Sequence, residues 1–254
     1  MRSIRLDMHQ YCINLCRRIV DMTTQSSLPK YVQISELLIR EIAAGRLADG
    51  ARLPPERDMA ADLAVSVGTL RKALADLEDK GMLRRVQGSG NYVRAGAPAN
   101  SVYSFFRLEL AEGGGLPTAQ VLSVDRLPKP AGAPDFGAAP EAHRVRRLRW
   151  LNDVPAALEE IWIDGALAKR ISVADLSESI YQFYRDRLGI WITRAEDRVG
   201  LGQVPDWGPQ AFPYAAGTTV GHVERVAWAQ DAHPIEYSRT WFDYEKVRHI
   251  SRIS

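Results

Sequence analysis

The chain has little that would indicate an extracellular, membrane-spanning or metal-bound protein. Only two cysteines, Cys12 and Cys16, occur among its 254 residues. Two thiols are too few for a structural zinc site, so we interpret them as reduced thiols of a cytoplasmic protein and expect no metal and no cofactor. No run of about 18 apolar residues is present, which excludes a membrane-spanning helix. The first residues also lack the apolar stretch of a signal peptide.

The chain also lacks a large excess of positive or negative charge, because 33 Lys and Arg residues are balanced by 31 Asp and Glu residues. The resulting net charge of +2 gives no strong field that would favour nucleic acid or a membrane surface. Hydrophobic residues make up 46% and charged residues 25% of the chain, which excludes a disordered or fibrous protein. The length fits two domains.

The front of the chain has the pattern of three helices. Apolar residues recur with a period near 3.6 over residues 31–47, which predicts an amphipathic helix. A turn with two prolines separates it from a short helix that ends near Leu63. Ser66 is a suitable N-cap for a third helix, which Gly81 ends.

The third helix and the segment after it are typical of a DNA-binding domain. Thr69, Arg71 and Lys72 lie opposite the apolar stripe, near the start of the helix that would enter a major groove. Two short strands around Gly88-Ser89-Gly90 predict a β-hairpin, or wing, whose glycines allow a close approach to a phosphate or a minor groove. A solvated helix face and a flexible turn would explain each feature taken alone. Their order and spacing indicate a winged helix-turn-helix.

This stretch resembles the GntR family of bacterial transcriptional repressors. The shared elements follow one another in the family's order: Tyr-x-Gln-Ile at 31–34, Gly-x-Leu-x-x-Gly-x-x-Leu-Pro at 45–54, Glu-Arg-x-x-Ala at 56–60, Val-Ser-x-x-Thr at 65–69, Arg-x-Ala-Leu at 71–74, Leu-x-x-x-Gly at 77–81 and Gly-x-Gly at 88–90. The resemblance covers roughly a quarter of the chain and implies double-stranded operator DNA as a partner.

The resemblance also implies which residues would contact DNA. Arg57, at the start of the second helix, and Arg71, on the third, would contact DNA, and Lys72 would lie beside Arg71. Ser66 and Thr69 would meet the DNA backbone or base edges. Gly88, Ser89 and Gly90 would lie along the minor groove.

Two positions depart from the family pattern. Val67 stands where many relatives have an arginine that contacts a guanine, and Pro55 replaces the usual capping serine. A bidentate arginine–guanine contact contributes about 1–3 kcal/mol of discrimination. The operator sequence of relatives therefore cannot be transferred to this chain, although DNA binding itself is still expected.

The back half of the chain has the pattern of an antiparallel sheet. Period-two alternation over residues 145–151 puts Arg147 and Arg149 on one face, with Leu148 and Trp150 on the other. A tight turn leads into a returning strand over residues 157–163. Further strands are expected over 190–199, 220–229 and 235–242, with a helix over 177–188. Few helices among sequential strands indicate an α+β domain.

Three charged residues of this half are candidates for binding a ligand. The guanidinium groups of Arg147 and Arg149 could hold a carboxylate or a phosphate, and a solvated basic sheet face is the alternative. Glu159 lies on an otherwise apolar face, where a buried carboxylate needs partners. Tyr237 shares a face with Ile235 and Arg239, as an ordinary half-buried tyrosine would.

The back half resembles the UTRA effector-binding domain, which is typical of the HutC-like branch of the GntR family and shares its fold with chorismate lyase. The matching segments are 147–163, 179–190 and 223–244. By resemblance, Arg147, Arg149, Glu159 and Tyr237 line a ligand cleft. The arginine of the family's late Tyr-Arg-Gly-Asp run is missing from residues 242–245, which weakens the case for a sugar phosphate.

These observations predict four regions. Residues 1–27 are an N-terminal extension, either disordered or the product of a start codon assigned too far upstream. Residues 28–95 form the winged helix-turn-helix, 96–104 a small-residue linker, and 105–254 the mostly antiparallel UTRA domain.

The whole chain is thus expected to be a cytoplasmic, homodimeric transcriptional regulator, most simply a repressor, controlled by a small anionic metabolite. An activator of the same architecture is the nearer alternative, and a lyase-type enzyme on the same back fold is the remote one. Against an enzyme, no nucleophile, base and acid occur at useful spacing.

Overall fold

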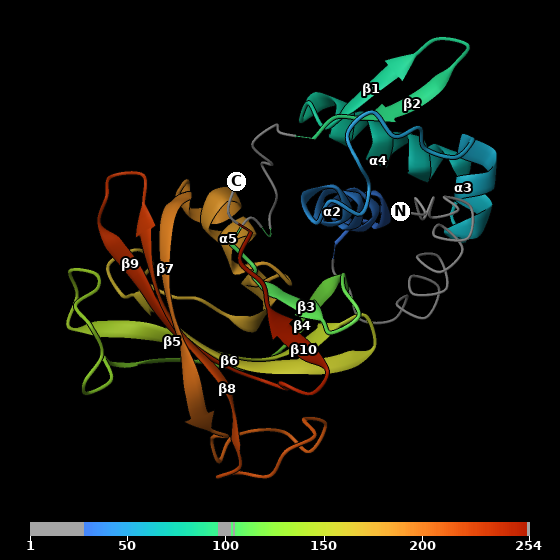
Figure 1. Ribbon diagram of the computed structural model, residues 1–254. Helices are drawn as coiled ribbons and strands as arrows, with labels where there is room; N and C mark the ends of the chain where they lie inside the picture. Colours follow the sequence, from blue (N-terminus) through green and yellow to red (C-terminus); the bar gives the residue numbers. More distant parts are fainter. Residues whose placement is uncertain (1–27, 96–102, 104, 253–254) are drawn as a thin grey trace. The chain divides into compact units, whose positions relative to one another are not determined.

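The computed structural model describes residues 28–95, 103 and 105–252 (Figure 1). The predictions for residues 1–27 and, Tyr103 apart, for the linker at 96–104 lie outside these described residues. The chain divides into two compact units, of which the first holds the described residues before 105 together with 112–116, and the second holds 105–111 and 117–250. Within the described residues, no helix has both the length and the apolar character that crossing a membrane requires.

The first unit contains three helices and a hairpin. The helices are α2 (Lys30–Ala43), α3 (Glu56–Asp62) and α4 (Val67–Asp79). Strands β1 (Leu83–Val86) and β2 (Gly90–Val93) pair antiparallel beside α4 (Figure 1). The apolar stripes predicted from the 3.6 period are buried in one core, which includes Leu38, Leu70 and Leu77. The predicted winged helix-turn-helix is therefore confirmed.

The second unit is built on a six-stranded antiparallel sheet in the order β4-β5-β6-β9-β8-β7. Its strands are β4 (Pro117–Pro128), β5 (Glu141–Leu151), β6 (Val154–Asp164), β7 (Ile192–Gln203), β8 (Thr219–Ala229) and β9 (Pro234–Phe242). A separate pair joins β3 (Leu108–Leu110) to β10 (Val247–His249). The predicted α+β class with a mostly antiparallel sheet is confirmed.

The two faces of the large sheet are covered by different segments. On one, which we call the helix face, Val145, Ile161 and Ile163 pack against Ile180 and Phe183. On the other, which we call the loop face, the side chains of Leu148, Leu158 and Trp241 pack against Val204 and Phe212, which lie beyond β7. Alternation along β5 and β6 thus produces two cores, one on each side of the sheet.

The predicted helix over 177–188 is shorter and less regular in the structure. It consists of α5 (Ile180–Phe183) and a π-helical turn, η2 (Tyr184–Leu188), and Gly189 ends it in the left-handed region at φ 65°. A 3-10 turn, η1 (Val173–Asp175), precedes it. Strand β7 also runs on to Gln203, beyond the predicted end. The helix and β3–β10 both lie on the helix face, and they position the cluster described below.

Candidate functional site

The start of α4 is fixed by its N-cap. The Ser66 Oγ accepts a hydrogen bond from the Thr69 backbone N–H at 3.1 Å, and the two side-chain oxygens lie 2.9 Å apart. This bond satisfies one of the free N–H groups of the first turn. Ser66 is exposed and Thr69 is half-buried, so both polar groups lie at the surface beside the helix start.

Helices α3 and α4 carry exposed basic side chains, and one of them connects the two helices. The side chain of Arg71 is 64% exposed, and its Nε donates to the Glu56 carboxylate at 2.6 Å. This hydrogen bond lowers the pKa of Glu56 and holds the guanidinium near the start of α3. Arg57 and Lys72 are exposed as well. The structure therefore brings Ser66, Thr69, Arg71 and Lys72 together on one helix, with Arg57 on the neighbouring one.

The wing has a sharply turned tip. Gly88 and Gly90 have φ angles of 74° and 122°, a region that side chains other than glycine rarely adopt. The Ser89 Oγ lies 2.6 Å from the Tyr92 hydroxyl, which ties the tip to β2. A Cβ on Gly90 would lie only 3.1 Å from the Arg52 Nε, so this glycine leaves room for an arginine against the wing.

Arg52 is a residue of this surface that the sequence pattern did not indicate. It reaches the wing because it forms an isolated β-bridge with Tyr92. A concavity of about 390 Å³ lies between the wing and the start of α3, and Arg52, Glu56 and Arg85 line it with residues 86–91. No periodicity marks Arg52, since it lies in a loop whose pairing depends on the folded hairpin.

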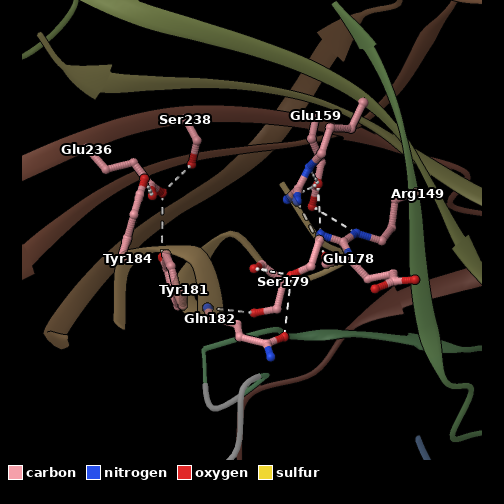
Figure 2. Close-up of polar contacts among 11 residues, drawn as sticks. Arg149, Glu159, Glu178, Ser179, Tyr181, Gln182, Tyr184, Glu236 and Ser238 are labelled. Carbon is pink, nitrogen blue, oxygen red and sulfur yellow. Dashed lines mark hydrogen bonds and ion pairs between the residues drawn. The ribbon is translucent and has the colours of Figure 1, made fainter. Parts of the chain in front are cut away.

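The strongest polar cluster of the second unit lies on the helix face of the sheet. Arg147 and Arg149 are 1% and 3% exposed, and both contact Glu159, which is 7% exposed. An Arg147 terminal nitrogen lies 2.7 Å and an Arg149 terminal nitrogen 3.0 Å from the same Glu159 oxygen. Both guanidinium groups also donate to the backbone carbonyl of Glu178, just before α5 (Figure 2).

The charges of this cluster are incompletely balanced among its three members. Burial alone would raise the pKa of Glu159, but the two arginines outweigh this effect and lower that pKa to about 2. Burial lowers the pKa of Arg147; Glu159 opposes this shift and the like charge of Arg149 adds to it. Two guanidinium groups sharing one carboxylate form a place where a further anion would be stabilised.

A second polar group lies next to this cluster on the helix face. Glu236 on β9 accepts a hydrogen bond from the Tyr184 hydroxyl at 2.5 Å and contacts Tyr181 and Ser238 at 3.5 and 3.4 Å. Figure 2 shows Glu236, Tyr184 and Ser238 on the left and Arg149 with Glu159 on the right. Burial raises the pKa of Glu236, although Tyr184 and two arginines act in the opposite direction.

Tyr237 is the one predicted ligand residue that the structure does not bring together with the others. Its side chain lies on the loop face, because neighbouring residues of a strand point to opposite faces. The Tyr237 hydroxyl donates to Glu224 at 2.5 Å, and its ring lies 6.2 Å from that of Phe136. Arg147, Arg149 and Glu159 do lie together: the alternation of β5 predicted that the two arginines share a face, and the family resemblance grouped Glu159 with them.

The four residues of the second polar group on the helix face were not predicted from the sequence. Glu236 could have been found, because alternation along β9 puts it opposite Tyr237. Choosing the correct face required the β6–β9 register, which pairs Ile163 with Glu236. Tyr181, Tyr184 and Ser238 become members only through the packing of α5 and η2 on the sheet, for which no local sequence signal exists.

The comparisons with known proteins agree with both units. Residues 30–93 match the family described as bacterial regulatory proteins, gntR family, and residues 112–248 match the UTRA domain. The chain is 58% identical over 230 residues to the HTH-type transcriptional regulator SmoD of Agrobacterium fabrum, an alignment that covers 91% of this chain and 98% of that protein. It is 25% identical over 243 residues to the HTH-type transcriptional repressor NagR of Bacillus subtilis, covering 92% and 100%.

A solved structure has the same fold. The possible transcriptional regulator YydK of Bacillus subtilis superposes with a TM-score of 0.51 at 23% identity, covering 89% of this chain and 100% of that one. The winged helix-turn-helix binds operator DNA and the UTRA domain binds a small-molecule effector, so the protein is a regulator and not an enzyme. The chain belongs to the gntR family of bacterial transcriptional regulators, in the HutC-like branch that carries a C-terminal UTRA domain.

Proposed function

We propose that the protein is a homodimeric, cytoplasmic repressor that leaves its operator when a small anionic metabolite binds to Arg147, Arg149 and Glu159. The observation that carries the anionic effector is the pair of buried guanidinium groups that share the single carboxylate of Glu159. A buried positive charge is costly unless it is paired, so an anion that joins the cluster gains both charge-assisted hydrogen bonds and relief of that cost.

Hydroxyl groups on the effector fit the second polar group. Glu236, Tyr181 and Tyr184 lie beside the arginine cluster and offer acceptors and donors within the same buried region (Figure 2). An anion that also carries hydroxyl groups can therefore satisfy both groups at once. Hydroxyl groups of the effector would add hydrogen bonds to the Glu236–Tyr184 pair, which a purely apolar carboxylate could not do.

DNA contacts are proposed for Arg57, Ser66, Thr69, Arg71, Lys72 and the wing tip at Gly88–Gly90. Support comes from the exposure of most of them at the start of α4, on α3 and at the wing, with Thr69, Ser89 and Gly90 half-buried. Repression is supported by the name of the relative NagR, a transcriptional repressor. A homodimer is supported by the symmetry argument that a two-fold operator matches two copies of one recognition helix.

The first experiment is selection of bound duplexes from a random DNA pool by the full chain, at about 150 mM salt so that non-specific phosphate binding is weakened. A two-fold symmetric motif is expected, and Arg71→Ala should lose it while keeping the wild-type circular dichroism spectrum. Lys169→Ala, an exposed change in the second unit, is the control. Undiminished operator affinity in Arg71→Ala would refute the assignment of α4.

The second experiment tests the effector site with inorganic phosphate as the probe. Phosphate should raise the melting temperature of the wild-type protein by binding the native state. Arg147→Lys with Arg149→Lys keeps both charges but loses the planar fork, so the double variant should bind phosphate more weakly. Arg126→Lys, an exposed arginine on β4, is the control. Equal phosphate shifts in the double variant and in the wild type would place the anion elsewhere.

A further inference from the structure

Two phenylalanines directly after the predicted linker contact the effector cluster. The centre of the Phe106 ring lies 5.0 Å from the guanidinium carbon of Arg149. The Phe105 ring meets that of Tyr181 edge-on, with centroids 5.9 Å apart and planes at 76°. Both phenylalanines are half-buried, and both precede β3 by only a few residues. The first residues of the second unit thus touch one member of each polar group.

We propose that Phe105 and Phe106 are positioning residues that transmit anion binding at Arg149 to the linker and hence to the DNA-binding domain. This inference rests on the proposed function, since it takes Arg149 as part of the effector site. Residues 96–104 connect the wing to Phe105 in the sequence. Whatever displaces Phe105 and Phe106 therefore acts directly on the end of that connection.

The physical link is the cation–π contact of Phe106. The nitrogens of the Arg149 guanidinium donate to Glu159 and to the Glu178 carbonyl, while its central carbon lies over the ring of Phe106. The attraction of a ring for a guanidinium comes from the positive charge. An anion that pairs with Arg149 reduces the effective charge that the ring meets and draws the guanidinium edge toward itself. Anion binding and the Phe106 contact therefore compete.

The segment after Phe106 is held firmly enough to carry a displacement. Leu108 and Leu110 of β3 pack with Leu151, Val223 and Phe242 of the large sheet in one buried cluster, and Phe106 packs against its edge. The packed β3 therefore holds the chain that follows Phe106 in place, so a shift of Phe106 acts on the residues that precede it and is not absorbed by loose chain after it.

Strand β10, the partner of β3, is tied to the same region by a polar contact of His249. His249 at its end lies 3.1 Å from an Asp197 oxygen, and Arg225 binds Asp197 through two hydrogen bonds of 2.5 and 2.7 Å. The hydroxyl of Tyr181, which Phe105 contacts, interacts with Arg225. The β3–β10 pair is therefore anchored to the helix face at both strands, through residues next to the proposed effector site.

The test measures the coupling between phosphate and the selected operator in the full chain. In the wild type, saturating phosphate should change operator affinity by about fivefold or more, as allosteric coupling commonly does. In Phe106→Leu the cation–π contact is absent, so phosphate no longer competes with it and should bind about two- to fivefold more tightly than in the wild type. Operator affinity, however, should no longer respond to phosphate. Phe105→Leu should also reduce the response.

Two matched variants separate transmission from general damage. Phe106→Tyr keeps the ring and should keep the wild-type response, and Phe212→Leu removes a phenylalanine from the loop-face core and should keep it too. A full response in Phe106→Leu overturns the inference and leaves the effector site intact. Absence of phosphate binding in the wild type overturns the proposed anion site, and the inference falls with it.

Discussion

Two carboxyl groups on the same sheet face have pKa values that are shifted in opposite directions, although both groups are buried. Glu159 is held ionised by two arginines, with a pKa of about 2, whereas burial raises the pKa of Glu236. The difference arises because both guanidinium groups hydrogen-bond Glu159 directly, while the closest partner of Glu236 is the Tyr184 hydroxyl. One face therefore holds a fixed negative charge and a group that favours its neutral form.

This contrast predicts the pH dependence of Glu236→Gln. A carboxyl group whose pKa is raised by folding destabilises the native state once the pH exceeds the folded pKa, and has no such effect below the unfolded pKa. The neutral amide should thus raise the free energy of unfolding by about 1 kcal/mol at pH 8 and leave it unchanged at pH 4. Denaturant titrations at both pH values measure the difference.

Glu160→Gln is the matched control, because the pKa of Glu160 is lowered in the folded protein whereas that of Glu236 is raised. Burial would raise the pKa of Glu160, yet hydrogen bonds from Arg239 and Arg146 on the loop face lower it. Its charge therefore stabilises the native state above the unfolded pKa, and Glu160→Gln should lower stability at pH 8. A loss of stability at pH 8 in Glu236→Gln as well would show that the Glu236 charge is favourable.

At the scale of an element, Ser66 has two roles that different substitutions can separate. Its side chain caps α4, and it is proposed to lie against DNA. Ser66→Ala should lose about 1 kcal/mol of stability because the cap is lost. Ser66→Asp keeps a capping oxygen, and its negative charge interacts favourably with the positive end of the helix dipole, so this variant should retain stability. The same charge should repel the DNA phosphates. Melting curves and operator titrations distinguish the three proteins.

Ser66→Asn supplies the control for charge, because asparagine caps as well as aspartate does but is neutral. It should keep both stability and most of the operator affinity. If Ser66→Asp binds the operator as tightly as Ser66→Asn, the start of α4 does not approach a phosphate, and the proposed docking of this helix is wrong.

The elements that could be predicted from the sequence have clear local signals at their ends. The capping serine at 66 and the left-handed glycine at 81 mark α4, and the turn at Asn152 marks the β5–β6 hairpin. Strand β4 was missed because a bulge between Val121 and Ser123 breaks its period-two alternation. Strands β3 and β10 have three residues each, too few for a period to be visible.

The residues of the candidate site also divide into those that local sequence signals predicted and those that only the folded structure brings together. Alternation put Arg147 and Arg149 on one face, and resemblance grouped Glu159 with them; the structure joins the three through two strands connected by a tight turn. Glu236 and Tyr184 come together across 52 residues, and only the folded sheet with its helix creates that contact. Tyr237 was grouped with the arginines by resemblance, without the register that assigns it to the loop face.

At the scale of the whole molecule, the salt dependence of operator binding reports how many DNA phosphates the protein neutralises. The change in this dependence on substitution of one residue gives the number of contacts which that residue makes. Each phosphate that a cation neutralises contributes a slope of about −0.9 in a plot of log K against log salt concentration. Lys72 is exposed near the start of α4. If two copies of the chain bind one operator, Lys72→Gln removes two such contacts, and the slope should become less steep by about 1.8.

Lys169→Gln, an exposed lysine of the second unit, should leave the slope unchanged. A change of about 0.9 for Lys72→Gln would indicate one bound copy per operator and contradict the homodimer. An unchanged slope would mean that Lys72 does not contact a phosphate in either copy. Because the slope depends on the number of ions released and not on base recognition, it tests the stoichiometry of the complex independently of Val67 and of the operator sequence.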